Sequence, residues 1–456
     1  MRVIFALLLA SLPLVAQASW TQLNPSQSPP LRGSATYVSH DASGSLLQLF
    51  GFDLASGTFA TTAWRFQGGS WALQPGPLPP LRDGASTAYD AVRQQAVLFG
   101  GYSPITSQMF TDTWLWNGVN WTQANPAVSP SARQAPAMAF DHRRGVVVLF
   151  GGRDAANQNL ADLWEWNGTT WQLQNVPNPP SGRAGAMLAF DPVSGAMVLH
   201  GGYVFVGQYY NVFNDTWSYD GTQWQQRFPA TPPSPRLLAG MVTDLHRQRV
   251  VMLGGVTNDP FAWEWDGAQW NPRYQANPAP RAIFGLGYDA LARRAIVTGG
   301  YVQLRGSTVW LNDTWSFQTP MPADVVPFGS GCAGTAGTPA LTAKAFSLPW
   351  LGDTMSNVVQ ATPAASPGAF FVSSFGSTPP LPLAGVGMPG CDLLVPLDVL
   401  EFRAAAAGRA EWALPIPNTP ALAAMQFRQQ AFVIDSAANA LGLVTSNGVV
   451  VTLGVR

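Results

Sequence analysis

The chain has 456 residues, with 24 basic and 25 acidic side chains and a formal net charge of -1. This balance excludes a general electrostatic attraction to nucleic acids or to anionic membrane surfaces. Charged residues make up 11% of the sequence, against about 25% in average domains, so uncharged polar side chains must cover much of the surface. We expect two domains, because a single core rarely serves more than about 300 residues.

The first 18 residues have the order of a secretory signal peptide. Arg2 is followed by an apolar run from Val3 to Val15 and then by Ala16-Gln17-Ala18, which are the charged, apolar and small-residue regions of such signals. The apolar run is too short to span a bilayer, and we expect no membrane span. The sequence therefore predicts export, with the mature protein secreted, extracellular or held in the periplasm or cell envelope.

A repeat of about 50 residues extends over residues 32 to 300. Each copy has an arginine, an apolar run, a short turn and a second apolar run that ends in glycine. A period near 50 residues predicts repeated four-stranded units. The glycines are Gly51, Gly100-Gly101, Gly151-Gly152, Gly201-Gly202, Gly254-Gly255 and Gly299-Gly300. The arginines are Arg32, Arg82, Arg133, Arg183, Arg236 and Arg281.

The second half of each unit is marked by tryptophans around a turn. In the second unit Trp114-Leu115-Trp116 precedes Asn117-Gly118, and Trp121-Thr122-Gln123 follows. Asn-Gly between two β-prone runs predicts a hairpin with a type I′ turn. Large rings at a fixed spacing are suited to filling the space between neighbouring sheets. The pairs seven residues apart are Trp64 and Trp71, Trp114 and Trp121, Trp164 and Trp171, Trp217 and Trp224, and Trp263 and Trp270.

The sixth unit lacks its fourth strand. It has Trp315-Ser316-Phe317 but no turn and no partner tryptophan after it, whereas Trp20-Thr21-Gln22 near the start of the chain matches Trp121-Thr122-Gln123. We therefore predict that the amino-terminal strand completes the last sheet and closes a ring. The predicted fold is all-β, with a six-bladed β-propeller over residues 19–318.

The repeated glycine pair, the strand after it and the later tryptophan resemble Kelch repeats. The resemblance covers about two thirds of the chain and implies a β-propeller of the Kelch and galactose-oxidase-like class. That class contains binding proteins and a few enzymes, so the resemblance alone does not decide activity.

Antiparallel strands sort the connections of a propeller onto two faces. The loops between units and the loops after the glycine pairs share one face, called here the upper face, where binding residues are expected. The long loops there are residues 102–111, 203–214 and 301–312, and their tyrosines suit sugars or protein loops. The alternative is that these rings pack over the sheets. The candidate ligand-binding residues of these loops are Tyr102, Arg153, Tyr203, Tyr209, Tyr210, Tyr301 and Arg305.

The six repeated arginines have two interpretations that stay open. They are candidate ligand-binding residues, because arginine clamps carboxylates with two parallel hydrogen bonds, and related Kelch propellers use arginines in this region to bind partners. The alternative is a structural role in every unit, through loop carbonyls or through the recurrent acids Asp112, Asp162, Asp215 and Asp313.

The sequence gives no catalytic or cofactor signature. His40, His142 and His246 fall in turns of the lower face, where we expect them to be solvated, and His200 stands alone beside a glycine pair. A copper site of the galactose-oxidase kind needs a different ligand set, and glycoside hydrolysis needs two carboxylates close together. We expect no metal, no cofactor and no enzyme activity.

Composition changes after Pro320, and a second domain is predicted. Residues 319–327 are interpreted as a linker, and residues 328–456 as a β-sandwich of short apolar runs, with a helix near Ala404 to Ala407 as the alternative for that segment. Cys332 and Cys391 lie 59 residues apart, and a disulfide between them is expected in an exported protein. The segments 328–334 and 414–418 resemble a carboxyl-terminal all-β module of secreted bacterial proteins.

Together these features predict a secreted binding or scaffold protein that uses the upper face of its propeller to bind a protein or a carbohydrate. Two alternatives stay open: a carbohydrate-active enzyme, sialidase-like or oxidase-like, and a structural component of the cell envelope. Nothing in the sequence predicts the oligomeric state.

Overall fold

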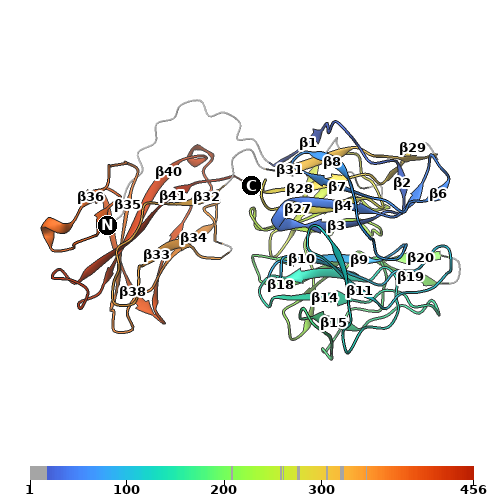
Figure 1. Ribbon diagram of the computed structural model, residues 1–456, viewed down its shortest axis with the longest axis horizontal. Helices are drawn as coiled ribbons and strands as arrows, with labels where there is room; N and C mark the ends of the chain where they lie inside the picture. Colours follow the sequence, from blue (N-terminus) through green and yellow to red (C-terminus); the bar gives the residue numbers. More distant parts are fainter. Residues whose placement is uncertain are drawn as a thin grey trace. The chain divides into compact units, whose positions relative to one another are not determined.

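The computed structural model describes residues 18–206, 209–256, 259, 261–274, 278–304, 307–318, 323–345 and 347–455. The chain divides into two compact units, Ser19–Gln318 and Thr319–Arg456, and both consist of β-strands (Figure 1). In the described part, no helix has the length and hydropathy needed to cross a membrane. The predicted signal peptide, apart from Ala18, and the candidate Arg305 lie outside the described residues.

The first unit contains six four-stranded antiparallel sheets among the described residues. In the first five, the four strands follow one another in the chain, as the repeat predicts. The first two sheets are β3 (Thr36–His40), β4 (Ser45–Leu49), β7 (Ala63–Gln67) and β8 (Ser70–Gln74), then β9 (Ser86–Asp90), β10 (Gln95–Phe99), β11 (Thr113–Trp116) and β12 (Trp121–Ala124). The third and fourth are β13 (Ala137–Asp141), β14 (Val146–Phe150), β15 (Leu163–Trp166) and β16 (Trp171–Gln174), then β17 (Met187–Asp191), β18 (Ala196–His200), β21 (Thr216–Tyr219) and β22 (Trp224–Arg227). The last two are β23 (Gly240–Asp244), β24 (Arg249–Leu253), β25 (Phe261–Trp265) and β26 (Trp270–Tyr274), then β27 (Gly285–Asp289), β28 (Arg294–Thr298), β31 (Thr314–Gln318) and β1 (Ser19–Leu23).

The sheets follow one another around an axis. The first strands β3, β9, β13, β17, β23 and β27 contact each other in this order, and β27 contacts β3. Apolar side chains fill the space between neighbouring sheets; between the third and fourth sheets these include Phe150, Leu188 and Trp224. Each sheet thus buries both faces against its neighbours, which a single repeat is unable to do alone.

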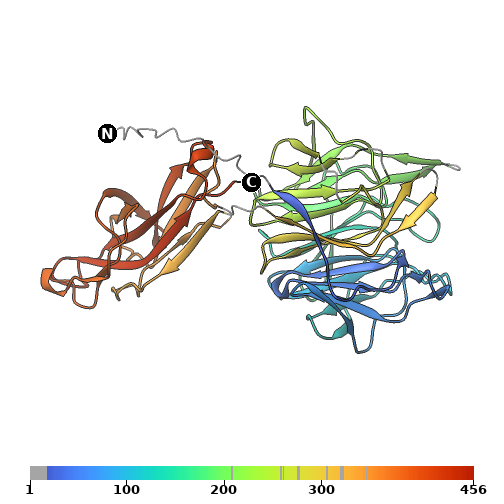
Figure 2. The same cartoon turned by 90° about the horizontal axis from the view of Figure 1, so that it is seen from above.

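The amino-terminal strand completes the sixth sheet. β1 pairs antiparallel with β31, with Trp20 opposite Phe317 and Gln22 opposite Trp315. The rings of Trp20 and Phe317 lie 4.8 Å apart. In Figure 2 the dark blue β1 lies apart from the other blue strands, which belong to the first sheet. The predicted pairing of the first strand with the last sheet is therefore confirmed.

The tryptophans of the fourth strands alternate in their hydrogen bonding. Trp71, Trp171 and Trp270 donate from Nε1 to Thr314, Thr113 and Thr216 of the preceding sheet, at 3.0, 2.9 and 2.9 Å. The matching donors of Trp121, Trp224 and Trp20 have no partner among the described residues. The strand positions equivalent to the threonines are Ala63, Leu163 and Ala262 there, and none of these side chains can accept a hydrogen bond.

The Asn-Gly turns differ from the predicted type I′ geometry. Trp116 pairs with Trp121, so the connection has four residues, and Asn117 keeps a negative φ while Gly118 has φ 90°. The side-chain oxygen of Asn117 accepts hydrogen bonds from the backbone of Val119 and Asn120, at 3.0 and 2.8 Å. This side-chain bonding replaces the two-residue turn.

The prediction of solvated histidines in the lower turns is wrong. His40 and His246 are buried. His142 is partly buried, and its ring contacts Phe140 and Phe190 at centroid distances of 5.0 and 5.3 Å. The turns are short, so these rings lie between neighbouring sheets. There they make apolar contacts with aromatic side chains.

The second unit is built around one eight-stranded sheet in the order β32-β41-β40-β35-β38-β39-β34-β33. Its two ends approach each other, since β33 contacts β41 and β32, and side chains of both halves form one core. Cys332 and Cys391 form the predicted disulfide. The strands are β32 (Asp324–Phe328), β33 (Ala340–Ala343), β34 (Thr354–Gln360), β35 (Gly368–Ser374), β38 (Val399–Ala406), β39 (Arg409–Pro415), β40 (Gln426–Ile434) and β41 (Leu443–Thr452), with the short pair β36 (Leu381–Pro382) and β37 (Asp392–Leu393) beside them.

Two details of this unit differ from the sequence-based expectations. Part of the predicted linker 319–327 is the strand β32, because Val325 and Pro327 pair with Val451 and Val449 and the segment joins the sheet. The segment Ala404 to Ala407, for which a helix was the alternative, ends strand β38 and enters a turn at Gly408. The strands form one continuous bent sheet rather than two separate sheets.

Candidate functional site

The repeated arginines are buried at the loop ends of the sheets. Arg133 donates from Nη1 to the carbonyl of Gly151 at 3.0 Å and from Nε to the carbonyl of Ser131 at 3.0 Å. Its two terminal nitrogens bind both oxygens of Asp162, at 2.6 and 2.8 Å. The same ion pair recurs in Arg82 with Asp112, Arg183 with Asp215, Arg236 with Asp259 and Arg281 with Asp313. Arg32 instead donates to the carbonyl and the hydroxyl of Thr62, at 2.7 Å each.

The acids of these pairs are held ionised. Burial by itself raises the pKa of Asp162, but the hydrogen bonds and charge of Arg133 and the indole N–H of Trp164, 2.7 Å away, bring that pKa below its ordinary value. The same causes lower the pKa of Asp112, Asp215 and Asp313. Because every arginine of the set is occupied by protein partners and buried, we leave all six out of the proposed site.

The sequence analysis missed the fifth acid, Asp259. The four recurrent acids stand two residues before a tryptophan, whereas Asp259 stands four residues before Trp263 and still accepts its indole hydrogen at 2.8 Å. Asp259 could have been found from Arg236, because a buried guanidinium without a counter-ion is strongly unfavourable.

The residues that follow the glycine pairs occupy equivalent places on the upper face. Tyr102 exchanges two backbone hydrogen bonds with Asp83, at 2.8 and 2.9 Å, and Arg153 does the same with Gln134 at 2.9 Å. Tyr203 and Tyr301 pair likewise with Ala184 and Ala282. Glycine is required before them: at Gly101, with φ 90°, a Cβ atom would lie 2.8 Å from the carbonyl oxygen of Asp83.

A cavity of about 400 Å³ opens among these loops. It brings together three of the sequence-predicted residues, Tyr102, Arg153 and Tyr203, and adds Asp83 and Gln134, which the sequence analysis did not single out. Polar side chains of Ser34, Thr36 and Tyr37 also line it, and the apolar side chains of its wall are Ala35, Ala85, Ala135, Leu238, Ala239, Met241, Ile283, Phe284 and Leu286. Tyr209, Tyr210 and Tyr301 are outside this lining.

Arg153 has part of its hydrogen-bonding capacity left over. The amide oxygen of Gln134 accepts from Nε at 3.0 Å and from Nη2 at 2.5 Å, while Nη1 has no partner among the described residues. Burial raises the pKa of Tyr102 and of Tyr203, and the charge of Arg153 opposes this rise in part. Burial also raises the pKa of Asp83, against the effect of the Gly84 backbone N–H. The cavity thus combines one cation with neutral hydroxyl groups.

Two hairpins with aromatic side chains lie on the same face as the cavity, and those of β19–β20 include the exposed rings of Phe205, Tyr209 and Tyr210. β19 (Tyr203–Val206) pairs with β20 (Tyr209–Val212), and β29 (Tyr301–Leu304) pairs with β30 (Ser307–Trp310). Figure 1 shows β19, β20 and β29 at the same end of the unit as β2 (Arg32–Gly33) and β6 (Thr58–Phe59).

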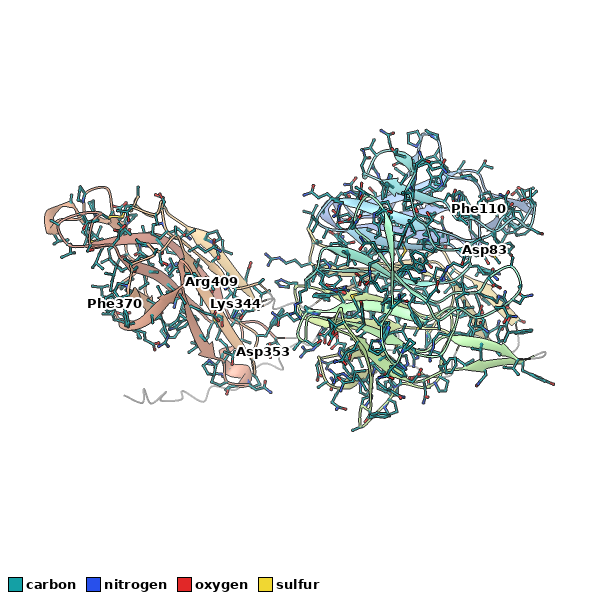
Figure 3. The ribbon with its side chains drawn as sticks, turned by 90° about the horizontal axis from the view of Figure 1, so that it is seen from below. Asp83, Phe110, Lys344, Asp353, Phe370 and Arg409 are labelled. Carbon is teal, nitrogen blue, oxygen red and sulfur yellow. A yellow bond between two sulfur atoms is a disulfide. The ribbon has the colours of Figure 1, made fainter. Side chains whose placement is uncertain are left out.

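The β19–β20 hairpin continues the cavity wall outward. Tyr210 contacts Tyr203 and Phe205 edge to face, at centroid distances of 5.1 and 5.2 Å, and Tyr209 is 79% exposed. Asp83 and Phe110, in loops of the second repeat, lie on the same face (Figure 3). The ring of Phe110 covers the guanidinium of Arg82 at 4.1 Å. This aromatic surface is larger than the sequence analysis anticipated.

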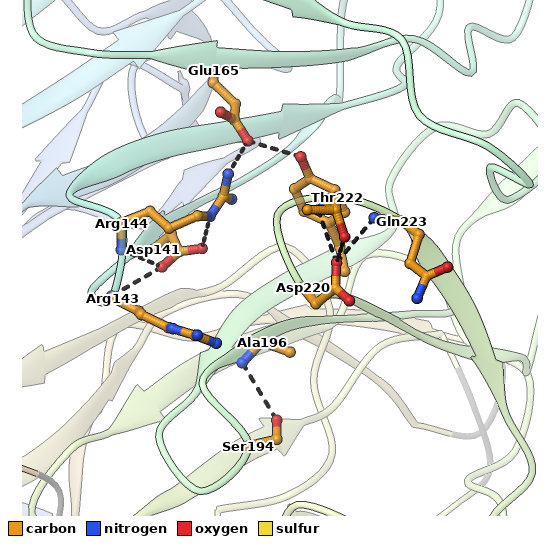
Figure 4. Close-up of polar contacts among 10 residues, drawn as sticks. Asp141, Arg143, Arg144, Glu165, Ser194, Ala196, Asp220, Thr222 and Gln223 are labelled. Atoms are coloured by element: carbon orange, nitrogen blue, oxygen red, sulfur yellow. Dashed lines mark hydrogen bonds and ion pairs between the residues drawn. The ribbon is translucent and has the colours of Figure 1, made fainter.

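The glutamates of the first unit belong to a different, lower region. Glu165 accepts hydrogen bonds from Arg144 and, at 3.0 Å, from the hydroxyl of Tyr219, and Arg144 also binds Asp141 at 2.7 Å (Figure 4). Glu264 is buried between Arg247 and Arg273. Asp83 is the one carboxylate among the described residues that line the upper cavity. Among the described residues, no group of three or more potential metal ligands gathers.

These sheets, loops and glycine pairs define an all-β repeat protein with a propeller-like arrangement. Residues 38–255 match the family model described as the KLHDC2/KLHL20/DRC7 Kelch-repeats domain. Residues 38–255 therefore carry Kelch repeats, and over this range the resemblance based on the glycines and tryptophans is confirmed. No curated protein matches the chain.

Proposed function

We propose that the six sheets are the blades of a six-bladed Kelch propeller, closed by β1, and that its upper face binds a protein partner. Kelch repeats support a protein-binding propeller as the general class. The observation that carries the proposal is the cavity of about 400 Å³ in which Tyr102, Arg153 and Tyr203 converge. A surface loop of a partner fits a cavity of this kind, because its wall combines apolar side chains with polar groups that can bind the loop backbone.

The aromatic hairpin favours a broad contact around that cavity. Tyrosines at interfaces supply a large rigid area and a hydroxyl group at a small entropic cost. Tyr209, Tyr210 and Phe205 are exposed by 79, 57 and 40% and lie together on one hairpin, and a contiguous exposed aromatic patch is a common mark of an interface. We therefore assign Tyr209 and Tyr210 to the rim of the contact, with Tyr301 as a further contact residue of the β29–β30 hairpin.

A carbohydrate is the second candidate ligand. Exposed tyrosine rings beside hydroxyl groups and one arginine are suited to stacking on a sugar and to binding its polar groups. Of the enzyme alternatives, a glycosidase has the weakest support, since a pair of carboxylates about 5 to 10 Å apart is the usual requirement and the described lining supplies Asp83 alone.

We further propose that the protein is exported from the cytoplasm. The signal-peptide pattern of residues 1–18 and the Cys332–Cys391 disulfide support an oxidising compartment outside the cytoplasm. The second unit, which we propose to be a sandwich-like accessory domain, has the role of a spacer or attachment module in this scheme. The third alternative, a structural envelope protein, predicts that this unit alone associates with cells.

The experiment is a comparison of matched surface variants. The mature chain is immobilised, proteins of the native secretome are passed over it, and a glycan array is probed in parallel. Tyr209→Ala and Arg153→Ala should each weaken binding by a factor of ten or more, because hot-spot aromatic and arginine contacts are worth about 1.4 kcal/mol and above. Leu291→Ala, which alters a 72% exposed lower-face side chain, should leave binding unchanged. Equal affinity of all three variants contradicts the proposed face.

A further inference from the structure

Asp41, in a lower turn of the first unit, is placed differently from the aspartates that end the first strands of the other five sheets. One of these, Asp191, binds the hydroxyl of Ser194 and the indole N–H of Trp265, at 2.6 and 3.1 Å, instead of an arginine. In four sheets an aspartate ends the first strand and an arginine of the next turn neutralises it: Asp90 with Arg93, Asp141 with Arg144, Asp244 with Arg247 and Asp289 with Arg294, at 2.8, 2.7, 3.5 and 3.3 Å. In the first sheet His40 occupies that position, opposite Ser45, and the carboxylate is displaced by one residue to Asp41.

Asp41 faces the axis of the ring. It begins the short helical turn η1 (Asp41–Ser43) and lines an axial cavity of about 110 Å³. Its carboxyl group accepts a hydrogen bond from the hydroxyl of Ser39. Among the described residues it has no ion pair with an arginine, a lysine or a histidine. Burial raises the pKa of Asp41 to about 7; the Ser39 hydrogen bond opposes this rise and the charge of Asp289 adds to it.

The groups around Asp41 supply no positive charge to it. From β27 it meets Tyr288 and Asp289, and from β9 it meets Tyr89. Arg294 is engaged by Asp289, and Arg93 by Asp90. His40 is committed to the hydroxyl of Ser43 and the carbonyl of Gln94, at 2.9 and 3.1 Å. His142 lines the same cavity, and burial lowers its pKa to about 4, so it is neutral when Asp41 titrates.

Asp41 also stands where the ring closes. η1 and β3 of the first sheet contact β27 of the sixth sheet, the sheet that β1 completes. The backbone N–H of Ala290 donates to the carbonyl of Asp41 at 3.3 Å. A Cβ atom on Gly44, next to this turn, would lie 2.3 Å from a carboxyl oxygen of Asp289. We call this contact between the first and sixth sheets the closing seam.

Apolar packing at the closing seam is modest. Its buried cluster consists of Leu46, Phe66, Trp71 and Ile296, with Leu23, Tyr37 and Trp64 packed against it. Eleven buried side chains form the cluster between the third and fourth sheets, and three form the cluster between the fifth and sixth. β27 presents Gly285 and Gly287 to the first sheet, where a Cβ atom would collide with Tyr37 and would crowd Leu46. An electrostatic change at Asp41 therefore acts on an interface with little apolar contact to offset it.

We propose that the closing seam is a pH-responsive closure of the ring, tight while Asp41 is protonated and weakened when Asp41 ionises beside Asp289. Ionisation transfers the proton to solvent and leaves a carboxylate in a cavity without a cation, next to a second acid. The elements that meet at the seam are η1, β3 and β27, so these elements respond first to the change. The proposal is independent of the ligand of the upper face.

The direction of the effect follows from proton linkage. The folded state holds the Asp41 proton up to about pH 7, whereas an unfolded aspartate releases it near its ordinary pKa of 3.8. The contribution of this group to stability is complete below about pH 4 and is lost as pH rises towards and through 7. Asp41→Asn keeps a neutral side chain at every pH and removes this loss.

The test compares full-length chains by urea unfolding and by hydrogen exchange between pH 5 and pH 8.5. The urea midpoint of the wild type should fall relative to that of Asp41→Asn as pH rises towards and through 7, and the change in amide protection should concentrate in β3 and β27. The control Asp154→Asn, a carboxylate of the upper face, should follow the wild-type profile.

A second variant keeps the test valid if Asp41→Asn fails to fold. Ser39→Ala removes one donor to the ionised carboxyl group, so it should move the fall in stability to higher pH. Parallel pH profiles of wild type, Asp41→Asn and Ser39→Ala would overturn the proposal. A pH effect spread evenly over all six sheets would also overturn it, because the seam would then have no special part in the transition.

Discussion

At the scale of single residues, the buried arginines explain why six positions keep the same residue type. A guanidinium stays charged in a protein, so a buried one needs hydrogen-bond acceptors around it, and for all of the six except Arg32 these include a carboxylate. In this chain the partners come from the same repeat, as with Arg133, Gly151 and Asp162. The cluster ties the loop before the first strand to the glycine pair and to the loop before the third strand, and so fixes the loops that form the upper face.

Replacing one of these arginines should unfold the first unit at much lower urea concentration. Arg133→Met leaves the carboxylate of Asp162 without its cation in a half-buried place, and breaking such a pair costs about 3 to 5 kcal/mol. Arg143→Met, at an exposed position of a lower turn, should change the free energy of unfolding by less than about 0.5 kcal/mol. Similar effects of the two substitutions would show that the pair contributes little.

His200 gives the chain a second pH dependence, opposite in sign to that of Asp41. It is fully buried, its Nδ1 lies 3.0 Å from the hydroxyl of Thr216, and burial together with the charge of Arg236 lowers its pKa to about 3. The folded state excludes the proton that an unfolded histidine binds below its ordinary pKa of 6.5. The stability from this group is present above pH 6.5 and is lost as pH falls towards 3.

His200→Phe should therefore resist acid better than the wild type. Linkage gives a loss of about 2 kcal/mol for the wild type between pH 8 and pH 5 that the variant does not share. Phenylalanine suits the position, because Phe99 and Phe150 stand at the same place in the second and third sheets. Urea unfolding at the two pH values measures the difference, and equal losses in both proteins would contradict the assignment.

At the scale of the sheets, the alternating tryptophans show where the repeat leaves hydrogen bonds unmade. Trp171 has Thr113 as its acceptor, but Trp121 faces the sheet that carries Ala63 at the same strand position. A buried donor without a partner costs about 1 to 3 kcal/mol. Three of the six junctions between sheets carry this cost.

Ala63→Thr should repair one of these junctions. The new hydroxyl group would stand at the place from which Thr113 accepts the indole hydrogen of Trp171, and the expected gain is about 1 kcal/mol in the free energy of unfolding. The reverse change, Thr113→Val, should lose about as much from the junction that already has its bond. Thermal unfolding of both variants measures the two effects; a loss of stability in Ala63→Thr would mean that the site has no room for the hydroxyl group.

The parts of the fold that repeat were predictable from the sequence. Arginines, glycine pairs and tryptophans recur at fixed spacing because every sheet needs the same contacts, and Asp112, Asp162, Asp215 and Asp313 were candidate partners for that reason. Features that occur once were missed. Asp259 lies at a different spacing, and His40 and His246 are buried by neighbouring sheets.

The candidate site was predictable in part, for a related reason. Tyr102, Arg153 and Tyr203 follow glycine pairs, so the repeat places them on one face. Asp83 and Gln134 each follow a repeated arginine and pair through their backbone with the residue after the glycine pair. The repeat marks these positions, but the pairing itself joins segments that are apart in the sequence. The extent of the cavity depends on loops of several sheets together, which single-sequence patterns do not describe.

At the scale of the whole molecule, closure depends on a strand that belongs to the last sheet but stands first in the chain. Trp20 of β1 packs on Phe317 and beside the cluster of Leu253, Ala262 and Val297. Trp20→Ala removes this ring and should cost about 2 to 4 kcal/mol, with faster hydrogen exchange in β31 and β28. Thr21→Ala, on the exposed side of the same strand, should be nearly neutral. Unchanged exchange in both variants would argue against closure by β1.

During synthesis, Ser19–Leu23 emerges before any other strand, and its partner Thr314–Gln318 emerges nearly 300 residues later. The five complete sheets are able to assemble progressively, because the strands of each are neighbours in the chain. The first strand has no partner strand for its backbone N–H and C=O groups until β31 has been made. Final assembly is thus a single late event that joins the most distant parts of the domain, and contacts of such long sequence separation are formed slowly. A newly made molecule spends that interval open on one side and exposed to wrong partners.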